Sequence, residues 1–104
     1  MPTRTPFEAI SDPTRRAILD SLADRGPIRA GELAALFPAI SRPAVSKHLR
    51  ILRGAQLVRQ EARGREIWYH LIPAPLSQVD GWLAKYSEFW QDRLQRLKEA
   101  AEAD

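Results

Sequence analysis

Seven of the sixteen lysine and arginine residues lie between positions 41 and 65, where a single acidic residue, Glu61, accompanies them. This block has a formal net charge of +6, whereas residues 1–40 are neutral overall and residues 66–104 have a net charge of −3. A local excess of basic side chains is the electrostatic footprint of a polyanionic partner such as nucleic acid. The alternative on charge alone is a solvated charged face.

Within this block, residues 41–53 have the pattern of a helix with one apolar and one basic side. Ser41 is a suitable N-cap, and Pro43 is tolerated in the first turn. Val45, Leu49 and Leu52 are spaced i, i+4 and i+7, so they form a stripe that faces the core. The outer side of the helix carries polar and basic residues: Arg42, Ser46, Lys47, Arg50 and Arg53.

A shorter helix precedes this one, with Leu33, Leu36 and Phe37 at helical spacing and Pro38 at its end. Two short helices joined by a tight turn, the second of them basic, form a helix-turn-helix over about residues 31–53. In proteins of this kind the second helix lies in the major groove of DNA and its first turns contact base edges. The partner we expect is therefore double-stranded DNA.

The position of each outer side chain on the second helix suggests its role. Arg42 and Ser46 are near the start of the helix and are expected to reach base edges, where the fork of an arginine can bind guanine. Lys47, Arg50 and Arg53 are expected to neutralise phosphates, which sets affinity and register. The sequence leaves open whether Arg42 binds a base or phosphate alone.

After Gly54 the apolar pattern changes from the helical period to the period of two that is typical of strands. Ile67, Tyr69 and Leu71 alternate with polar or amphipathic residues, and a turn at Gly64 makes residues 57–71 a hairpin. Its tip carries Arg63 and Arg65, which we expect to contact DNA in the minor groove or on the adjoining backbone. A basic helix followed by a basic hairpin is typical of a winged helix-turn-helix.

The last part of the chain, about residues 75–102, predicts one long helix of about 40 Å. Its apolar residues form a broad stripe that a domain of this size cannot cover by itself, so we expect it to pack on a second copy in a twofold dimer. The alternative is a core helix of one chain. The stripe consists of Leu76, Val79, Leu83, Tyr86, Trp90 and Leu97, with Trp82 and Phe89 beside them.

Other kinds of chemistry have little support in the sequence. The chain has no cysteine. His48 lies beside the buried stripe, so we expect a packed or backbone-bonded residue and not a metal ligand, and His70 has no second ligand or nucleophile nearby in the sequence. Paired carboxylates and phosphate-binding glycine loops are missing, so we expect no enzyme and no cofactor. No apolar run approaches the roughly 20 residues that span a bilayer, and we expect a cytoplasmic protein without membrane contact.

The sequence resembles the ArsR family of winged helix-turn-helix repressors. The resemblance rests on residues 7–19 (FEAISDPTRRAIL), 32–36 (ELAAL) and 41–52 (SRPAVSKHLRIL), and it extends over residues 7 to about 97. It implies a single domain over residues 1–104, mainly α-helical with a small β-hairpin (α+β). It also implies a homodimer whose first helix, with Phe7, and last helix form the interface, and repression by occupying an inverted-repeat operator.

The chain departs from the metal-sensing members of this family at both of their metal sites. Those members carry a cysteine pair where this chain has Leu33-Ala34-Ala35, or histidine and carboxylate ligands on a last helix that here contains no histidine. The resemblance therefore favours the metal-independent branch of the family. Repression would then be regulated by an unknown small molecule, by a partner protein or through autorepression. The alternatives are a metal sensor that uses only Asp, Glu and His ligands, and a winged helix that binds other proteins.

Overall fold

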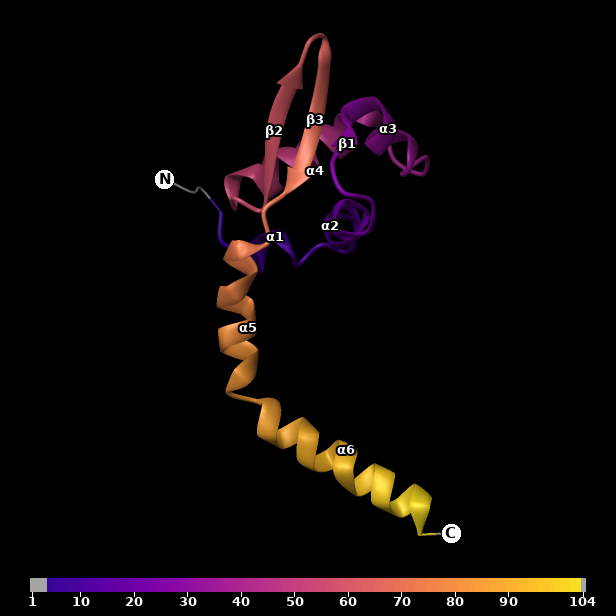
Figure 1. Ribbon diagram of the computed structural model, residues 1–104, viewed down its shortest axis with the longest axis vertical. Helices are drawn as coiled ribbons and strands as arrows, with labels where there is room; N and C mark the ends of the chain where they lie inside the picture. Colours follow the sequence, from indigo (N-terminus) through magenta and orange to yellow (C-terminus); the bar gives the residue numbers. More distant parts are fainter. Residues whose placement is uncertain (1–3, 104) are drawn as a thin grey trace.

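The helix-turn-helix and the hairpin form one packed body, from which the C-terminal helices extend (Figure 1). The computed structural model describes residues 4–103. Its radius of gyration is 17.7 Å, against about 13 Å for a compact chain of this length, because of this extension. The elements are α1 (Pro6–Ala9), α2 (Pro13–Arg25), β1 (Ile28–Arg29), α3 (Ala30–Ala35), α4 (Arg42–Gly54), β2 (Val58–Arg63), β3 (Glu66–Leu71), η1 (Ala74–Leu76), α5 (Ser77–Ala84) and α6 (Ser87–Glu102).

Three helices begin with the same local device, an N-cap oxygen next to a proline in the first turn. The side chains of Thr5, Asp12 and Ser41 each accept a hydrogen bond from the backbone N–H three residues later, at 3.1, 3.0 and 3.2 Å. These bonds satisfy donors that the first turn of a helix leaves free. The helix start predicted at Ser41 is confirmed.

The core lies between α2, α3, α4 and the sheet. The stripe predicted on the second helix of the helix-turn-helix is confirmed, because Val45, Leu49 and Leu52 on α4 are at most 3% exposed. Leu33 of α3 packs into the same cluster. The helix α3 ends at Ala35, two residues earlier than its apolar pattern predicts, and Leu36 forms its C-cap. Because the apolar side of α4 is buried in this core, its basic side faces the surface.

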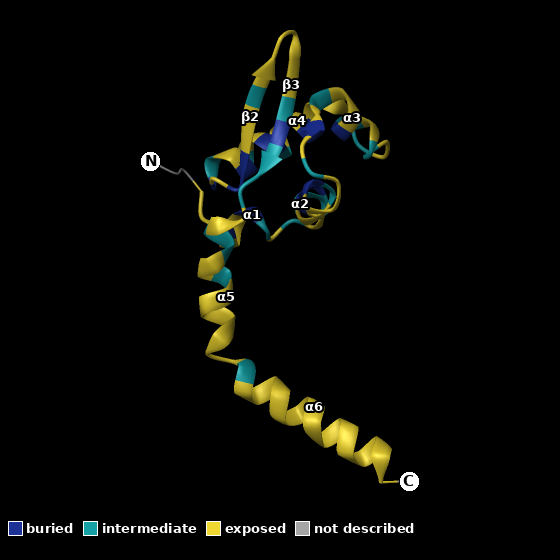
Figure 2. Ribbon diagram, in the orientation of Figure 1, coloured by how far each residue is buried: buried dark blue, intermediate teal, exposed yellow. Residues whose placement is uncertain are grey.

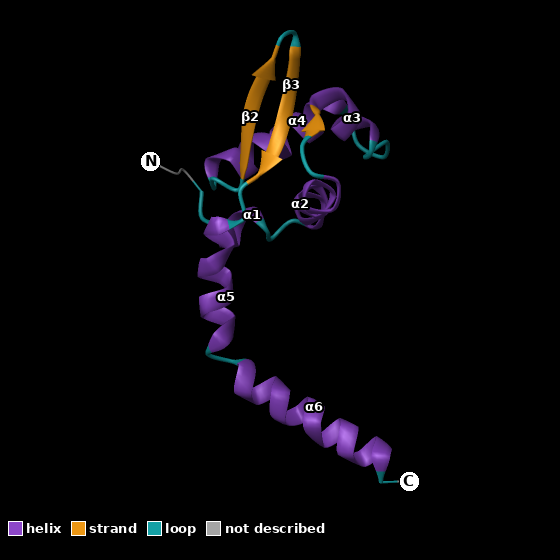
Figure 3. Cartoon of the chain, in the orientation of Figure 1, coloured by secondary structure: helices purple, strands orange, loops and turns teal. Residues whose placement is uncertain are grey.

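The sheet is antiparallel, with strand order β1-β3-β2 (Figure 3). The hairpin β2–β3 turns at Gly64, whose φ of 61° at the first central position is typical of a type II′ turn. Tyr69 is buried and pairs with Ile28 of β1. Ile67 is 38% exposed although it shares the period of Tyr69, since it lies near the tip of the hairpin, beyond the core.

The C-terminal end of α4 forms a Schellman motif without the glycine that usually occupies it. The N–H of Gln56 bonds to the carbonyl of Arg53 at 2.9 Å, and the N–H of Leu57 bonds to that of Leu52 at 3.0 Å. Gln56 has a φ of 61°, a left-handed conformation that costs a residue with a side chain about 1–2 kcal/mol. The end of the recognition helix is therefore held by a strained residue.

We expect Gln56→Gly to raise the free energy of unfolding by about 0.5–1 kcal/mol, because glycine adopts this φ without strain but loses more entropy on folding. Urea denaturation followed by circular dichroism measures the change. Gln78→Gly is the matched control in the exposed helix α5, where glycine should lower the free energy of unfolding by about 1 kcal/mol. A loss of stability in both variants would show that Gln56 is not strained.

The single helix predicted for about residues 75–102 is wrong, because the structure has η1, α5 and α6 in its place. At the break, the N–H groups of Lys85 and Tyr86 bond to carbonyls three residues earlier, as in a turn, and the Ser87 hydroxyl donates to the Ala84 carbonyl at 2.9 Å. A serine that bonds the backbone in this way competes with the helical bonds. The break changes the direction of the apolar stripe between α5 and α6.

Candidate nucleic-acid interface

The outer side of α4 is a continuous basic surface, which we call the basic face. All five side chains predicted there are exposed. None of its four cations forms an ion pair with any residue that the structure describes. They are therefore free to bind an external anion without first breaking an internal contact. The basic face consists of Arg42, Ser46, Lys47, Arg50 and Arg53.

The structure adds Arg59 to the cations predicted from the sequence. Arg59 is exposed on β2 and, with Arg50 and Arg53, lines an open cleft of about 1000 Å³ between the end of α4 and the hairpin. Glu61, the acidic residue of the block, does not line this cleft. Arg59 belongs to the block with a net charge of +6, so the charge count indicated a basic residue here. The strand pattern did not predict that Arg59 lies beside the end of α4.

At the wing tip, the two arginines differ in their surroundings. The Nε of Arg63 bonds to the carboxylate of Glu61, and its guanidinium lies 4.5 Å from the centre of the Trp68 ring. Arg65 is exposed and has no ion pair among the described residues. The structure therefore leaves Arg65 at the tip for an external partner, while Arg63 is folded back along the strand.

Glu61 also holds His70, the second histidine of the chain. The His70 Nε2 lies 3.0 Å from a carboxylate oxygen of Glu61, so this nitrogen carries the hydrogen. The hydrogen bond from His70, and after it the one from Arg63, lowers the pKa of Glu61. His70 thus takes part in a polar cluster on the wing.

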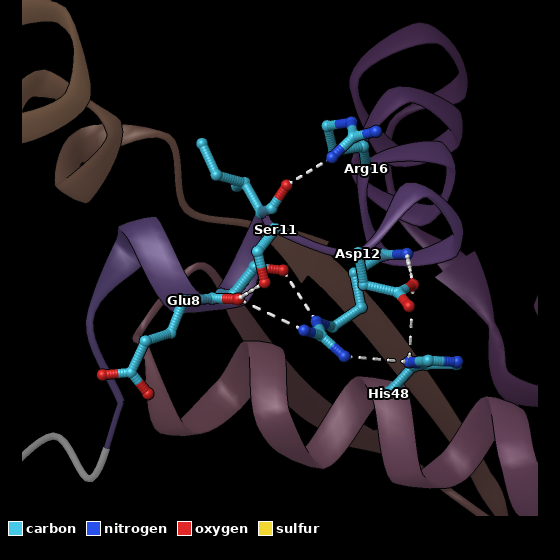
Figure 4. A network of polar contacts seen from close by, with 8 residues as sticks. Glu8, Ser11, Asp12, Arg16 and His48 are labelled. Atoms are coloured by element: carbon cyan, nitrogen blue, oxygen red, sulfur yellow. Dashed lines mark hydrogen bonds and ion pairs between the residues drawn. The ribbon is translucent and has the colours of Figure 1, made fainter.

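The start of α2 and the middle of α4 meet in a polar cluster beneath the basic face (Figure 4). The His48 Nδ1 lies 3.9 Å from the carboxylate of Asp12, which caps α2. The hydrogen bond from the backbone N–H of Arg15 is the main cause that lowers the pKa of Asp12. Arg16 donates to the Ile10 carbonyl at 2.6 Å and so holds the chain before α2. Among residues 4–103, no group of three or more His, Asp or Glu side chains could hold a metal ion.

The helices α5 and α6 are exposed along most of their length (Figure 2). Together with α1 they carry a second exposed surface, which we call the apolar face. Seven of its members were predicted, and the structure adds Leu94, which is 63% exposed. Two other predicted interface residues, Leu76 and Val79, are half-buried, and Leu76 packs against the core. None of the described helices has the length and hydropathy of a membrane span. The apolar face consists of Phe7, Trp82, Leu83, Tyr86, Phe89, Trp90, Leu94 and Leu97.

The fold and the basic face together define a winged helix-turn-helix regulator, and comparisons with known proteins agree. A family model described as a helix-turn-helix domain matches residues 10–61. The transcriptional repressor SdpR of Bacillus subtilis is 41% identical over 80 residues, which are 77% of this chain and 87% of the relative. The HTH-type transcriptional regulator Rv2034 of Mycobacterium tuberculosis is 46% identical over 73 residues, which are 70% of this chain and 66% of the relative.

The solved structures place the chain more narrowly. An ArsR-like transcriptional regulator from Rhodococcus sp. RHA1 has a TM-score of 0.70 and 38% identity, and the match covers 94% of this chain and 88% of that one. The chain belongs to the ArsR family of winged helix-turn-helix transcriptional repressors. These relatives are regulators of transcription and not enzymes.

Proposed function

We propose that the protein is a homodimeric repressor that binds an inverted-repeat operator through the basic face of α4 and responds to a signal other than a metal. The observation that carries this proposal is the basic face itself, whose four cations are exposed and unpaired among residues 4–103. They lie on the second helix of a helix-turn-helix, the element that enters the major groove. The cations are thus positioned to reach both base edges and phosphates.

The size of the domain supports two copies on the operator. A single module of this kind buries only about 600–1,000 Å² on DNA, which gives limited specificity. The apolar face supplies a surface for the second copy, because an exposed apolar patch of this extent on an isolated chain favours association. A twofold dimer presents two copies of α4, so we expect half-sites whose centres are about one helical turn apart.

At the ends of each half-site, the wing supplies a further contact. Arg65 is the wing residue that we assign to DNA, since Arg63 is held by Glu61 and Trp68. The cleft lined by Arg50, Arg53 and Arg59 adds positive potential between α4 and the wing. A phosphate backbone that follows this surface releases counterions, which makes binding strongly dependent on salt.

The proposed independence from metals is supported by the residues at the family's two sensing positions. The third helix has Leu33, Ala34 and Ala35 where metal-sensing members carry cysteines, and no histidine occurs in α5 or α6. Zinc, nickel and cobalt added to the protein–DNA complex are expected to leave it intact. Release of the DNA at stoichiometric metal would instead support a sensor with carboxylate and histidine ligands.

The expected role of Arg42 in base recognition is tested by Arg42→Ala on two duplexes, one with the native half-sites and one with the contacted guanines replaced. We expect a loss of about 1–3 kcal/mol of binding free energy per arginine on the native duplex and a much smaller loss on the altered one. Arg25→Ala, at the exposed end of α2, is the control. Equal losses on both duplexes would mean that Arg42 contacts phosphate only.

A further inference from the structure

The side chain of Arg15 connects α1 to α4, which is the recognition helix of the helix-turn-helix. Its Nε donates to the Ala9 carbonyl at 2.7 Å, and its Nη2 donates to the Glu8 carbonyl at 3.2 Å. The third nitrogen, Nη1, lies 3.3 Å from the Nδ1 of His48 on α4. One guanidinium therefore holds the carbonyls at the end of α1 and a side chain of α4 at once, as its fixed fork of donors allows.

The contact with Arg15 determines the form of His48. A guanidinium has donors and no acceptor, so the Nδ1 of His48 must accept, and the hydrogen of the neutral ring must be on Nε2. The His48 side chain is 20% exposed and lies between Arg15 and Asp12. It comes from the inner side of α4, whereas the basic face is on the outer side. The His48 side chain therefore lies on the side of α4 away from the basic face.

The other side of α1 is part of the apolar face. The Phe7 ring of α1 packs edge-on against the Trp82 ring of α5, with their centres 5.9 Å apart. Trp82 in turn contacts the Tyr86 ring at 5.3 Å. A continuous set of contacts thus runs from Tyr86 and Trp82 through α1 and Arg15 to His48 on α4.

We propose that Arg15 is a positioning residue that couples α1, at the apolar face, to the orientation of the recognition helix through His48. This inference rests on the proposed function, because it assigns a consequence for DNA binding to the position of α4. One feature favours it over a purely local role for Arg15. The guanidinium divides its donors between the carbonyls of α1 and the His48 ring of α4. A shift of α1 on the apolar face would therefore move or break the contact with His48.

The test compares Arg15→Lys, His48→Leu and the double variant in binding to a duplex taken from the DNA that precedes the protein's own coding region. Lysine keeps the charge of Arg15, but one ammonium cannot hold α1 and His48 together. Each single variant is expected to lose about tenfold in affinity with an unchanged salt dependence. The double variant should lose no more than either single one, because both remove the same contact. His48→Gln keeps an acceptor and should recover part of the affinity.

The matched control is Arg16→Lys, since Arg16 is the neighbouring arginine, donates to the Ile10 carbonyl and forms no hydrogen bond or ion pair with α4 in the described part of the chain. It should bind DNA almost as the wild type does. Nitrogen NMR of the histidine rings provides a readout that a general loss of stability would not change. In the wild type, neutral His48 should carry its hydrogen on Nε2, and in Arg15→Lys this preference should weaken. Thermal denaturation identifies any variant that fails to fold. If Arg15→Lys fails to fold, the comparison of His48→Leu with His48→Gln tests the proposal instead.

Three results would overturn the inference. Losses that add in the double variant would show that Arg15 and His48 act independently. A smaller salt dependence in Arg15→Lys would make Arg15 a phosphate contact. A His48 tautomer that is unaffected by Arg15→Lys would show that the contact has no influence on the ring. If the wild type bound no DNA, the proposed function and the inference would both fail, while the ring tautomer would still report whether Arg15 holds His48.

Discussion

Trp90→Glu is expected to convert the protein from a dimer to a monomer and to lower its affinity for the operator by about 100-fold or more. Trp90 lies in the middle of the apolar face and, with Phe89, Tyr86 and Leu83, lines an exposed apolar hollow of about 490 Å³. In a twofold dimer the same surface of both chains is buried, so one substitution places two carboxylates in the interface. Burying unpaired charges costs several kcal/mol.

Sedimentation equilibrium measures the change in mass, and a mobility-shift titration measures the change in affinity. Gln95→Glu is the control, because at 100° per residue position 95 is turned about 140° away from Trp90 around α6. It adds the same charge and should leave the dimer intact. A Trp90→Glu protein that sediments as the wild type does would show that the apolar face is not the dimer interface.

Lys47→Gln and Arg50→Gln are expected to reduce the salt dependence of DNA binding, each by about two in the slope of log K against log salt. The value of two arises because a dimer carries two copies of each side chain and each copy neutralises one phosphate. Affinity should fall by a similar factor on all duplexes, since phosphate contacts carry no sequence information. Both side chains are exposed and unpaired among residues 4–103, so the fold should be unaffected.

The control for this prediction is Arg25→Gln, which removes one exposed cation at the end of α2. Its slope should equal that of the wild type, because a distant charge releases no counterion from DNA. A slope that is unchanged in Lys47→Gln and Arg50→Gln would place the DNA away from the basic face. A fall of the same size in Arg25→Gln would indicate a general effect of net charge.

The parts of the fold that the sequence predicted correctly are those with local signals. Ser41 starts α4 by accepting a hydrogen bond from the backbone N–H three residues later, so the neighbouring residues determine this helix start. The buried stripe of α4 follows from its spacing, and the hairpin turn follows from Gly64. In each case the residues that determine the structure lie within about one or two turns of one another.

The features that the sequence did not predict depend on contacts between distant positions or on competing bonds. The helical spacing of the apolar residues continues across positions 85 and 86 without interruption. The helix nevertheless ends there, because the Ser87 hydroxyl bonds to the Ala84 carbonyl in competition with the helical backbone bonds. The partners of Arg63 are Glu61 and Trp68, and the second of these is on the neighbouring strand. The contact between Arg15 and His48 joins residues 33 positions apart. Side-chain type alone does not indicate such pairings.

The most direct test of the central claim is a hydroxyl-radical footprint of the protein on the DNA that precedes its own coding region. The account predicts two protected half-sites related by inverted symmetry, with centres about one helical turn apart, and their loss in Trp90→Glu. Protection of a single half-site by a monomer, or uniform DNA cleavage at protein concentrations that saturate the mobility shift, would contradict it.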